Sequence, residues 1–454
     1  MPGDAPRGIS GGTVGESRGS AADLDGHGHD CAVAFPKLPT GFVFGTSDTI
    51  PPGSRKQQLE RDIELLQELG APGYRFTAAW NELQPTGRGP LDATARDHYD
   101  RLADTLLAAG LQPSATLYAG ELPAALAADG GWLNRATVEC FAAYASAVGE
   151  LLADRVTDWV PVQDPNVAAY LGYGMGTVAP GQQAGWGVVS AMHHVLLAHG
   201  RGVQALRSAG AASVGCATHH EPIWPLSDDP ADVGAAKLVD QAWNAVPMEA
   251  MLLGRYPRDL APLLDEIVLP GDMATIRSPL DFYGINFFAP QRVGAAPEGD
   301  AVPFRIVPTV GHPATDTGWA VVPSALREWL VITRARYRAA MPPFVVTGCG
   351  AAYDVAVVDG EVDDQSRIDY LEAHLEAVSA AIERGVDVRG FYAYTLLDGD
   401  GWEAPFSGKD WEDSIGGKYG LVHVDAAGVR TPKASFAWYA DLVAAHAAGA
   451  PAAG

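Results

Sequence analysis

Short apolar runs alternate with longer amphipathic runs over most of this chain. The short runs are rich in β-branched and aromatic residues, which is typical of strands buried in a parallel sheet. They predict eight strands, at residues 42–45, 73–76, 112–118, 158–162, 213–218, 281–286, 343–347 and 388–394. Longer runs with apolar residues three and four positions apart predict amphipathic helices. Examples are 58–70, 97–110 and 367–385, and each ends in a glycine suited to a helix C-terminus.

Eight strands alternating with helices, without a break in composition, predict an α/β fold with a single (β/α)8 TIM barrel. A doubly wound sheet is the alternative, but no GxGxxG motif follows the first predicted strand. We place the barrel at residues 35–443. Residues 1–34 are rich in Gly, Ser, Asp and Ala and predict a disordered N-terminal tail. Residues 444–454 predict a C-terminal tail.

The charge and the cysteines narrow the class of protein. The formal net charge is −24, which disfavours binding to nucleic acid and to anionic membranes. The four cysteines lack the spacing of a metal site and indicate reduced thiols. The chain shows no signal-peptide pattern and no apolar stretch long enough to span a membrane. We therefore expect a cytoplasmic protein without metal or cofactor, acting on a small molecule.

Polar residues follow the predicted strands, at the end of the barrel where such folds place their active sites. The main ones are Ser47, Asp48, Glu121, Gln163, Asp164, His219, His220, Glu221, Asn286, Asp398, Asp400 and Trp402, with Cys349 after the seventh strand. Together they predict a ring of groups around a small-molecule site. Adjacent strand residues point to opposite faces, so only one of the two histidines can enter it.

Several motifs extend the pattern into a family resemblance. They include YRFTAAW (residues 74–80), GGWLNR (130–135), YLGYGMGTVAPG (170–181) and DFYGINFF (281–288). Over roughly residues 35–443 the chain resembles glycoside hydrolase family 1, the β-glucosidase family. The resemblance implies a barrel whose retaining mechanism uses two carboxylates, a nucleophile after strand seven and an acid/base after strand four. It also implies that His219, rather than His220, faces the pocket.

The sequence departs from the family pattern at the catalytic positions. Where the family has Thr-Glu-Asn-Gly, this chain reads Thr347-Gly348-Cys349-Gly350, so glycine stands at the nucleophile position. The acid/base motif Asn-Glu-Pro reads Gln163-Asp164-Pro165. Arg75, which in the family faces the nucleophile, remains. Changed sugar-contacting positions include Glu121 in Tyr-Ala-Gly-Glu-Leu-Pro, Phe287 in place of a tyrosine, and glycine before Trp402.

These departures predict a divergent family member that lacks the nucleophile. We expect Asp164 and His219 to be catalytic, and the substrate to contact Arg75, Glu121, Gln163, Asn286, Phe287, Cys349 and Trp402. Cys349 is either a reactive thiol or a small buried one that fills space. The favoured interpretation is an enzyme repurposed for acid/base cyclisation, isomerisation or elimination in specialised metabolism, with a glycosylated or polycyclic substrate. The alternatives are a non-catalytic pseudoglycosidase that binds a glycoside or a partner, and a residual or atypical β-glycoside hydrolase.

Overall fold

The main sheet forms the wall of a barrel. The computed structural model describes residues 35–48, 56–300, 302–399 and 417–449. Within this part of the chain the sheet has nine strands, all paired in parallel, in the order β5-β4-β3-β2-β1-β12-β11-β8-β6. They are β1 (Val43–Asp48), β2 (Gly73–Thr77), β3 (Gln112–Thr116), β4 (Asp158–Val160), β5 (Ser213–Val214), β6 (Cys216–His219), β8 (Tyr283–Phe287), β11 (Phe344–Cys349) and β12 (Val388–Tyr394).

The two outermost strands in this order, β5 and β6, are consecutive along the chain and separated only by Gly215. They are two parts of one barrel strand, and a bridge between Gln163 and Ala217 helps to join it to the end of β4. The eight resulting barrel strands match the eight predicted ones. The α/β fold with a single TIM barrel is therefore confirmed.

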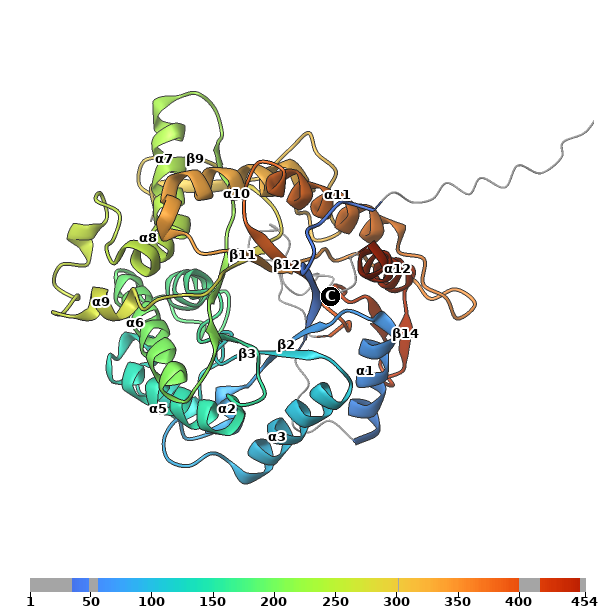
Figure 1. The fold of residues 1–454 in the computed structure, drawn as a ribbon. Helices are drawn as coiled ribbons and strands as arrows, with labels where there is room; N and C mark the ends of the chain where they lie inside the picture. The colour runs from blue at the N-terminus through green and yellow to red at the C-terminus, as the bar shows by residue number, and fades with distance from the viewer. Residues whose placement is uncertain (1–34, 49–55, 301, 400–416, 450–454) are drawn as a thin grey trace, which may run out of the picture. The chain divides into compact units, whose positions relative to one another are not determined.

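Helices surround this barrel, as Figure 1 shows. The α-helices are α1 (Lys56–Leu69), α2 (Trp80–Leu83), α3 (Ala93–Ala108), α4 (Ala124–Ala128), α5 (Ala136–Leu152), α6 (Gly187–Ser208), α7 (Pro230–Asp240), α8 (Val246–Leu253), α9 (Asp272–Ile276), α10 (Pro323–Tyr337), α11 (Gln365–Ile382) and α12 (Ala434–Gly449). Shorter 3-10 or π segments are η1 (Gly131–Leu133), η2 (Val167–Met175), η3 (Gln241–Ala245), η4 (Ala261–Leu263) and η5 (Arg338–Ala340).

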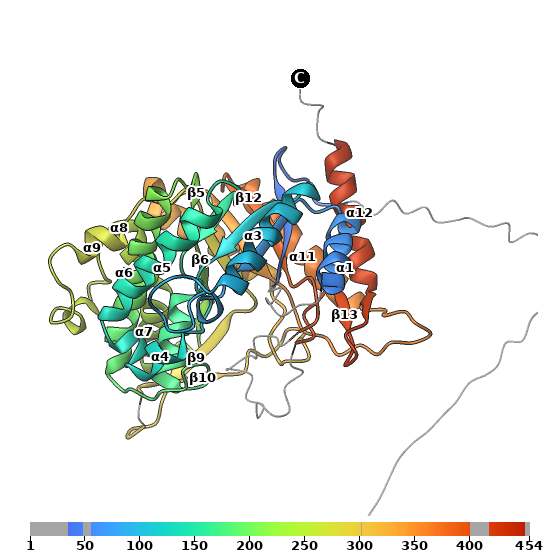
Figure 2. The same ribbon diagram turned by 90° about the horizontal axis from the view of Figure 1, so that it is seen from below.

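Smaller sheets decorate one end of the barrel. They are built from β7 (Ile223–Pro225), β9 (Gln291–Ala295) and β10 (Phe304–Val307), and from β13 (Val422–Val424) and β14 (Arg430–Pro432). Each of β7, β9 and β13 follows the carboxyl end of a barrel strand. In the side view of Figure 2, β9 and β10 lie at the same end as α4, which follows β3. This end is the mouth at which TIM barrels carry their sites.

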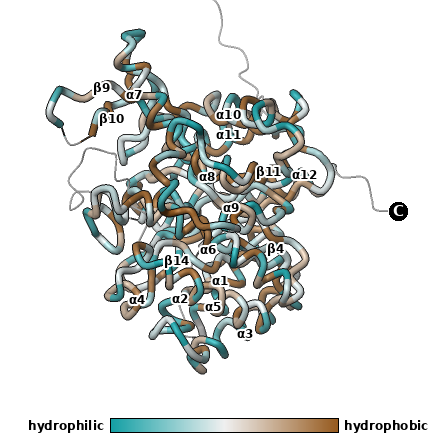
Figure 3. Tube along the Cα trace, turned by 90° about the vertical axis from the view of Figure 1, so that its left-hand side faces the viewer, coloured by the Kyte–Doolittle hydropathy of each residue, from teal (hydrophilic) through white to brown (hydrophobic). Residues whose placement is uncertain are grey.

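Apolar side chains fill the space between the strands and the helices. The helices carry hydrophobic and hydrophilic positions in alternation, as Figure 3 shows by colour. Their apolar faces join one large buried cluster with the strands, which includes Trp80, Trp132, Trp159 and Tyr439. Local signals fix the helix ends: Asp92 caps α3 by accepting from the backbone N–H groups of Thr94 and Ala95. The pattern of one buried face per helix is the one that the sequence predicts.

The boundaries predicted for the two tails can be compared with the structure only at the C-terminal end. The predicted N-terminal tail, residues 1–34, lies outside the described residues. Helix α12 runs to Gly449 and so continues past position 443, where we expected the barrel to end. None of the helices in the described ranges is both long enough and apolar enough to cross a membrane.

Candidate active site

The expected site residues come from the carboxyl ends of several barrel strands. Arg75 lies on β2, Gln163 and Asp164 follow β4, and His219 ends β6. Asn286 of β8 is paired with His219 on one side and with Gly348 of β11 on the other. Residues paired between neighbouring strands point to the same side of a sheet. The fold therefore brings positions 219, 286 and 348 to one level of the barrel.

The carboxyl group of Asp164 is held by Asn286. The Nδ2 group of Asn286 lies 2.9 Å and 3.0 Å from the two carboxylate oxygens. Desolvation raises the pKa of Asp164 above its ordinary value, against the opposing effects of the His219 charge, the Asn286 hydrogen bond and the Arg75 charge. A carboxyl group with a raised pKa keeps its proton to higher pH, as a general acid must.

The backbone of Asp164 is unusual as well. Its φ is +49°, in the left-handed region that residues other than glycine seldom adopt. The backbone N–H of Asp164 donates to the carbonyl of Ala217 at 2.8 Å, which ties the turn to the neighbouring strand. Strained backbone of this kind persists where the surroundings fix it, and it is common at functional sites.

Arg75 is buried, with 4% of its surface exposed, and its partners are uncharged. Its Nη1 donates to Thr116 Oγ1 at 3.2 Å and to the side-chain oxygen of Gln163. Its Nη2 donates to the carbonyl of Thr347 at 2.8 Å. Among the described residues, its Nε has no hydrogen-bond partner. Desolvation lowers the pKa of Arg75, against the effect of Asp164, Tyr392 and Tyr394, but a guanidinium remains charged at physiological pH.

Gly348 follows Thr347 directly and leaves this position without a side chain. The three atoms nearest to a Cβ placed there would all belong to Asn286, at 2.9, 3.4 and 3.9 Å. The Oδ1 atom of Asn286, the closest of them, also accepts the hydroxyl of Thr347 at 2.7 Å. A larger residue at position 348 would therefore have to displace an anchored side chain.

His219 forms a buried pair with Glu221. The imidazole Nε2 lies 3.1 Å from Glu221 Oε1, and both side chains are buried. Burial by itself would lower the pKa of His219, but the Glu221 carboxylate and the charge of Asp164 raise it above its ordinary value. The ring also packs near Trp243 and Phe288, with centroids 5.8 Å and 5.4 Å away. Glu221 therefore favours the protonated form of the His219 imidazole.

His220 points to the other side of the strand. Its ring nitrogens lie 3.0 Å from Asn244 Oδ1 and 3.0 Å from Tyr283 Oη, and its ring packs on Trp329 of α10. Burial lowers the pKa of His220 to about 3, so it stays neutral over the physiological range. The two histidines thus have opposite environments, and His219 is the one that interacts electrostatically with Asp164.

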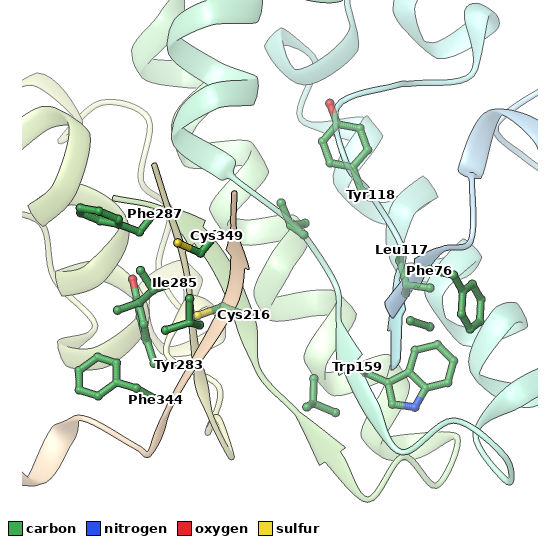
Figure 4. Packing of buried hydrophobic residues seen from close by; sticks show 14 of the residues in the cluster. Phe76, Leu117, Tyr118, Trp159, Cys216, Tyr283, Ile285, Phe287, Phe344 and Cys349 are labelled. Carbon is green, nitrogen blue, oxygen red and sulfur yellow. The ribbon is translucent and has the colours of Figure 1, made fainter. Parts of the chain in front are cut away.

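The structure places Phe287 and Cys349 away from these groups. The two residues are paired across β8 and β11, and Figure 4 shows them together in the apolar core. The ring of Phe287 lies 5.8 Å from that of His374 of α11, and Cys349 Sγ lies 3.8 Å from Tyr370 Oη of the same helix. Side chains alternate along a strand, so neighbours of Asn286 and Gly348 face the helices. Burial raises the pKa of the Cys349 thiol to about 12, which makes it unreactive.

The expected substrate contact at Phe287 therefore needs correction, as does the one at Cys349. The aromatic residue that lies beside His219 is Phe288, which also packs against Trp319 and Tyr394. The sequence analysis missed Phe288 because it assigned the substrate contact to Phe287, the residue directly after Asn286. Phe288 is the second residue after Asn286. Alternation along β8 would have identified it.

Other predicted residues are spread more widely. Glu121 is exposed and accepts from Nδ2 of Asn81, a residue of α2, at 2.7 Å. Trp402 and Asp400 lie outside the described residues. Glu221, which the sequence places in the predicted ring without a role, is brought beside His219 by the i, i+2 spacing. Within the described ranges, no group of three or more His, Cys, Asp or Glu side chains is arranged to hold a metal ion.

Comparisons with known proteins show to which family the chain belongs. A family model described as glycosyl hydrolase family 1 matches residues 18–448. The chain is 34% identical to a β-glucosidase of Agrobacterium sp. over 97% of this chain and 95% of that protein. It is 36% identical to a bifunctional β-D-glucosidase/β-D-fucosidase of Bifidobacterium breve over 86% of this chain and 87% of that protein. The solved family 1 β-glucosidase from Thermotoga maritima has a TM-score of 0.81 at 29% identity, covering 91% and 99% of the two chains.

These relatives contradict the favoured interpretation of the sequence. An enzyme repurposed for cyclisation, isomerisation or elimination is wrong, because relatives at 34% and 36% identity over most of the chain are named glucosidases. The alternative of a β-glycoside hydrolase fits them better. The error came from treating the altered sugar-contacting positions as a sign of new chemistry.

Proposed function

Because the chain belongs to glycosyl hydrolase family 1, we propose that it hydrolyses β-glycosides with an atypical catalytic arrangement. The observation that carries the proposal is the carboxyl group of Asp164, which is desolvated and held by Asn286 at the barrel mouth. Its raised pKa suits it to protonate the oxygen of the departing group. The substrates of the named relatives make aryl β-glucosides and β-fucosides the first compounds to test.

The arrangement is atypical because position 348 is glycine. A retaining glycosidase needs a second carboxylate about 5 Å from the first, to form the glycosyl-enzyme intermediate. Here the turn after β11 supplies none, and the nearby carboxylate of Glu221 is paired with His219. We assign to Asp164 the role of general acid, and to His219 that of a neighbour whose charge lowers the pKa of Asp164 against the effect of desolvation. Without the covalent step, turnover falls below that of ordinary family members.

The remaining polar groups orient the substrate in this proposal. Arg75, Gln163 and Asn286 lie around Asp164 and form one hydrogen-bonded set with Thr347. Phe288 adds an aromatic surface next to His219. Rigid positioning of this kind contributes to the rate by holding the glycosidic oxygen near the acid.

Leaving-group dependence tests the role of Asp164. We expect Asp164→Asn to lower kcat/KM for alkyl β-glucosides by about 10²–10⁴. The loss should be much smaller for a dinitrophenyl β-glucoside, whose leaving group departs without a proton. Asp97→Asn, an exposed substitution on α3, is the matched control. Equal losses for both substrates would remove Asp164 from the role of acid. If the wild type binds β-glycosides and hydrolyses none of them, the chain is a binding protein and the proposal fails.

A further inference from the structure

Glu221 lies in the short connection between β6 and β7, and its side chain is buried with 4% exposed. Its Oε1 atom lies 3.1 Å from His219 Nε2 and accepts from Nε2 of Gln291, the first residue of β9, at 3.2 Å. The backbone of Glu221 is bound by the side chain of Asn244 in η3. The Nδ2 group of Asn244 donates to the Glu221 carbonyl at 2.8 Å, and its Oδ1 accepts the Glu221 N–H at 3.4 Å. The carboxylate is therefore fixed by residues of β6, β9 and η3.

The partner of this carboxylate, His219, is also held on several sides. Its carbonyl accepts from Asn166 Nδ2 at 2.7 Å, which fixes the backbone at the end of β6. Its ring is buried, with centroids of Trp243 and Phe288 at 5.8 Å and 5.4 Å. Side chains that are locked by packing and hydrogen bonds keep their mutual geometry. The contact between His219 and Glu221 is therefore a fixed feature of the site.

The charge of His219 links this contact to the acid. Desolvation lowers the pKa of His219, while the Glu221 carboxylate and then the charge of Asp164 raise it. Desolvation raises the pKa of Asp164, and the charge of His219 is the first of the effects that oppose it, before those of Asn286 and Arg75. Charges act on one another more strongly in a buried site than in water. The protonation of His219 therefore changes the proton affinity of Asp164.

The further polar groups that contacts bring to this pair are mostly uncharged. Gln291 and Asn244 carry amide side chains. His220 stays neutral, because burial lowers its pKa to about 3. The carboxylate of Asp240, in α7, contacts Nδ2 of Asn244 at 2.9 Å. The negative charge in contact with the imidazole is that of Glu221.

We propose that Glu221 is a positioning residue for the hydrolysis of β-glycosides and acts on the acid Asp164 through His219. The carboxylate holds the imidazole in place and in its charged form, and the charged imidazole favours the ionised form of Asp164. Desolvation alone would make Asp164 hold its proton too firmly, whereas a general acid works best with a pKa near the working pH. The pair offsets this effect. The inference rests on the proposed function, to which it adds a residue.

The pH profile of Glu221→Gln tests the direction of this effect. The substitution keeps the size of the side chain and removes its charge, so His219 becomes neutral and no longer lowers the pKa of Asp164. Activity that needs protonated Asp164 is lost as pH rises through that pKa. We therefore expect the alkaline limb of kcat/KM for an alkyl β-glucoside to move up by about one pH unit. A direct effect of the Glu221 charge on Asp164 has the opposite sign, so a limb that moves down or stays in place overturns the proposal.

A second set of variants tests whether the effect passes through the imidazole. His219→Asn should move the limb in the same direction, and adding Glu221→Gln to it should cause no further shift. A further shift in that background overturns the proposal. Gln291→Met is the matched control, since it removes a hydrogen bond from Glu221 and keeps the carboxylate. Its limb should stay in place, and a shift equal to that of Glu221→Gln would assign the effect to packing and reject the role of the charge.

The protonation of Asp164 is also measurable without a substrate. In an NMR titration of protein labelled at the aspartate carboxyl carbons, the Asp164 signal is the one that Asp164→Asn removes. It should titrate at higher pH in Glu221→Gln than in the wild type. This shift in a protein that hydrolyses no glycoside would support the link from Glu221 to Asp164 and reject the proposed function. Hydrolysis with an unmoved carboxyl titration would reject the link and leave the proposed function standing.

Discussion

Asn286 lies 2.9 Å and 3.0 Å from the two carboxylate oxygens of Asp164 through a single amide nitrogen. Its amide oxygen is in turn fixed by the hydroxyl of Thr347 at 2.7 Å. The donor is therefore locked in one orientation by a residue of another strand. Asp164 follows β4 and Asn286 lies on β8, so the position of the carboxylate depends on the packing of the barrel and not only on the turn that carries Asp164.

Removing the amide should change the pH dependence of hydrolysis. The hydrogen bond from Asn286 favours the charged form of Asp164 and lowers its pKa, so Asn286→Ala should raise that pKa further. Activity that needs protonated Asp164 is lost as pH rises through its pKa. We therefore expect the alkaline limb of kcat/KM to move to higher pH in the variant, while Asp97→Asn leaves it in place. An alkaline limb that moves down would contradict this assignment of the acid.

Glu221→Gln should lower the pKa of His219. The raised pKa of His219 depends on the Glu221 carboxylate, and without it desolvation dominates. An NMR titration of the histidine ring protons would show His219 titrating above about 6.5 in the wild type and below it in the variant. His220, with a pKa of about 3, provides an internal control that does not titrate in this range.

The same pair should make stability depend on pH. The pKa of His219 is higher in the folded protein than in the unfolded chain. Its contribution to the free energy of unfolding is therefore fully present below the unfolded pKa. It is lost as pH rises through the folded pKa. The difference in unfolding free energy between wild type and Glu221→Gln should therefore shrink from pH 6 upward, as measured by urea denaturation. A difference that grows with pH would show that His219 is not charged in the folded protein.

Gly348→Glu should fail to produce an ordinary glucosidase. Its Cβ would lie 2.9 Å from Asn286 Oδ1, so the substitution disturbs the residue that holds Asp164. The changed sugar-contacting positions, including Gln163, are unaffected by it. We expect kcat for aryl β-glucosides to stay well below the enzyme median of about 10 per second. Turnover at or above that value would mean that glycine is the single defect.

Asp272 is expected to be a stability determinant away from the site. Its carboxylate lies 2.5 Å from Arg135 Nη2 and 2.9 Å from His193 Nε2, and it accepts the backbone N–H of Leu269 at 2.8 Å. Asp272→Ala should cost about 1–3 kcal/mol at neutral pH, because it leaves the buried imidazole of His193 and the backbone N–H of Leu269 without this acceptor. The exposed Arg96–Asp97 pair, removed by Asp97→Asn, should cost at most about 1 kcal/mol.

This contribution of Asp272 should fade in acid. Arg135, Leu269 and His193 together outweigh desolvation and lower the pKa of Asp272, so its stabilising effect is present above the unfolded pKa. It is lost as pH falls through the folded value. Urea denaturation of both proteins between pH 7 and pH 3 measures this, and a penalty that is constant over the range would contradict it.

The barrel could be predicted from the sequence because its signals are local and repeated. Each strand is a short apolar run, each helix carries an apolar face, and eight repetitions leave little choice of fold. The order of the strands and the levels of Asp164, His219 and Asn286 follow from that fold.

The finer features of the site depend on contacts between distant segments. The pairing of Glu221 with His219 and the outward direction of Phe287 follow from strand alternation, and close reading could have found them. The hydrogen bonds from Asn286 to Asp164 join residues that are 122 positions apart along the chain, so no local sequence pattern predicts them. Nor could the uncharged surroundings of Arg75, because they depend on a threonine of β3 and a carbonyl of β11.

Gln163 and Asp164 are consecutive, and they connect the guanidinium to the acid through one peptide unit. Gln163 accepts from Arg75, while Asp164 has a φ of +49° and its backbone N–H donates to the carbonyl of Ala217 at 2.8 Å. A substitution of Arg75 therefore affects Asp164 in two ways: it removes the hydrogen bond that holds Gln163, and it removes a positive charge. The energetic effects of substituting Arg75 and Asp164 should consequently fail to add, with an interaction energy of about 0.5–3 kcal/mol in a double-mutant cycle. In thermodynamic terms, the two residues behave as one cooperative unit.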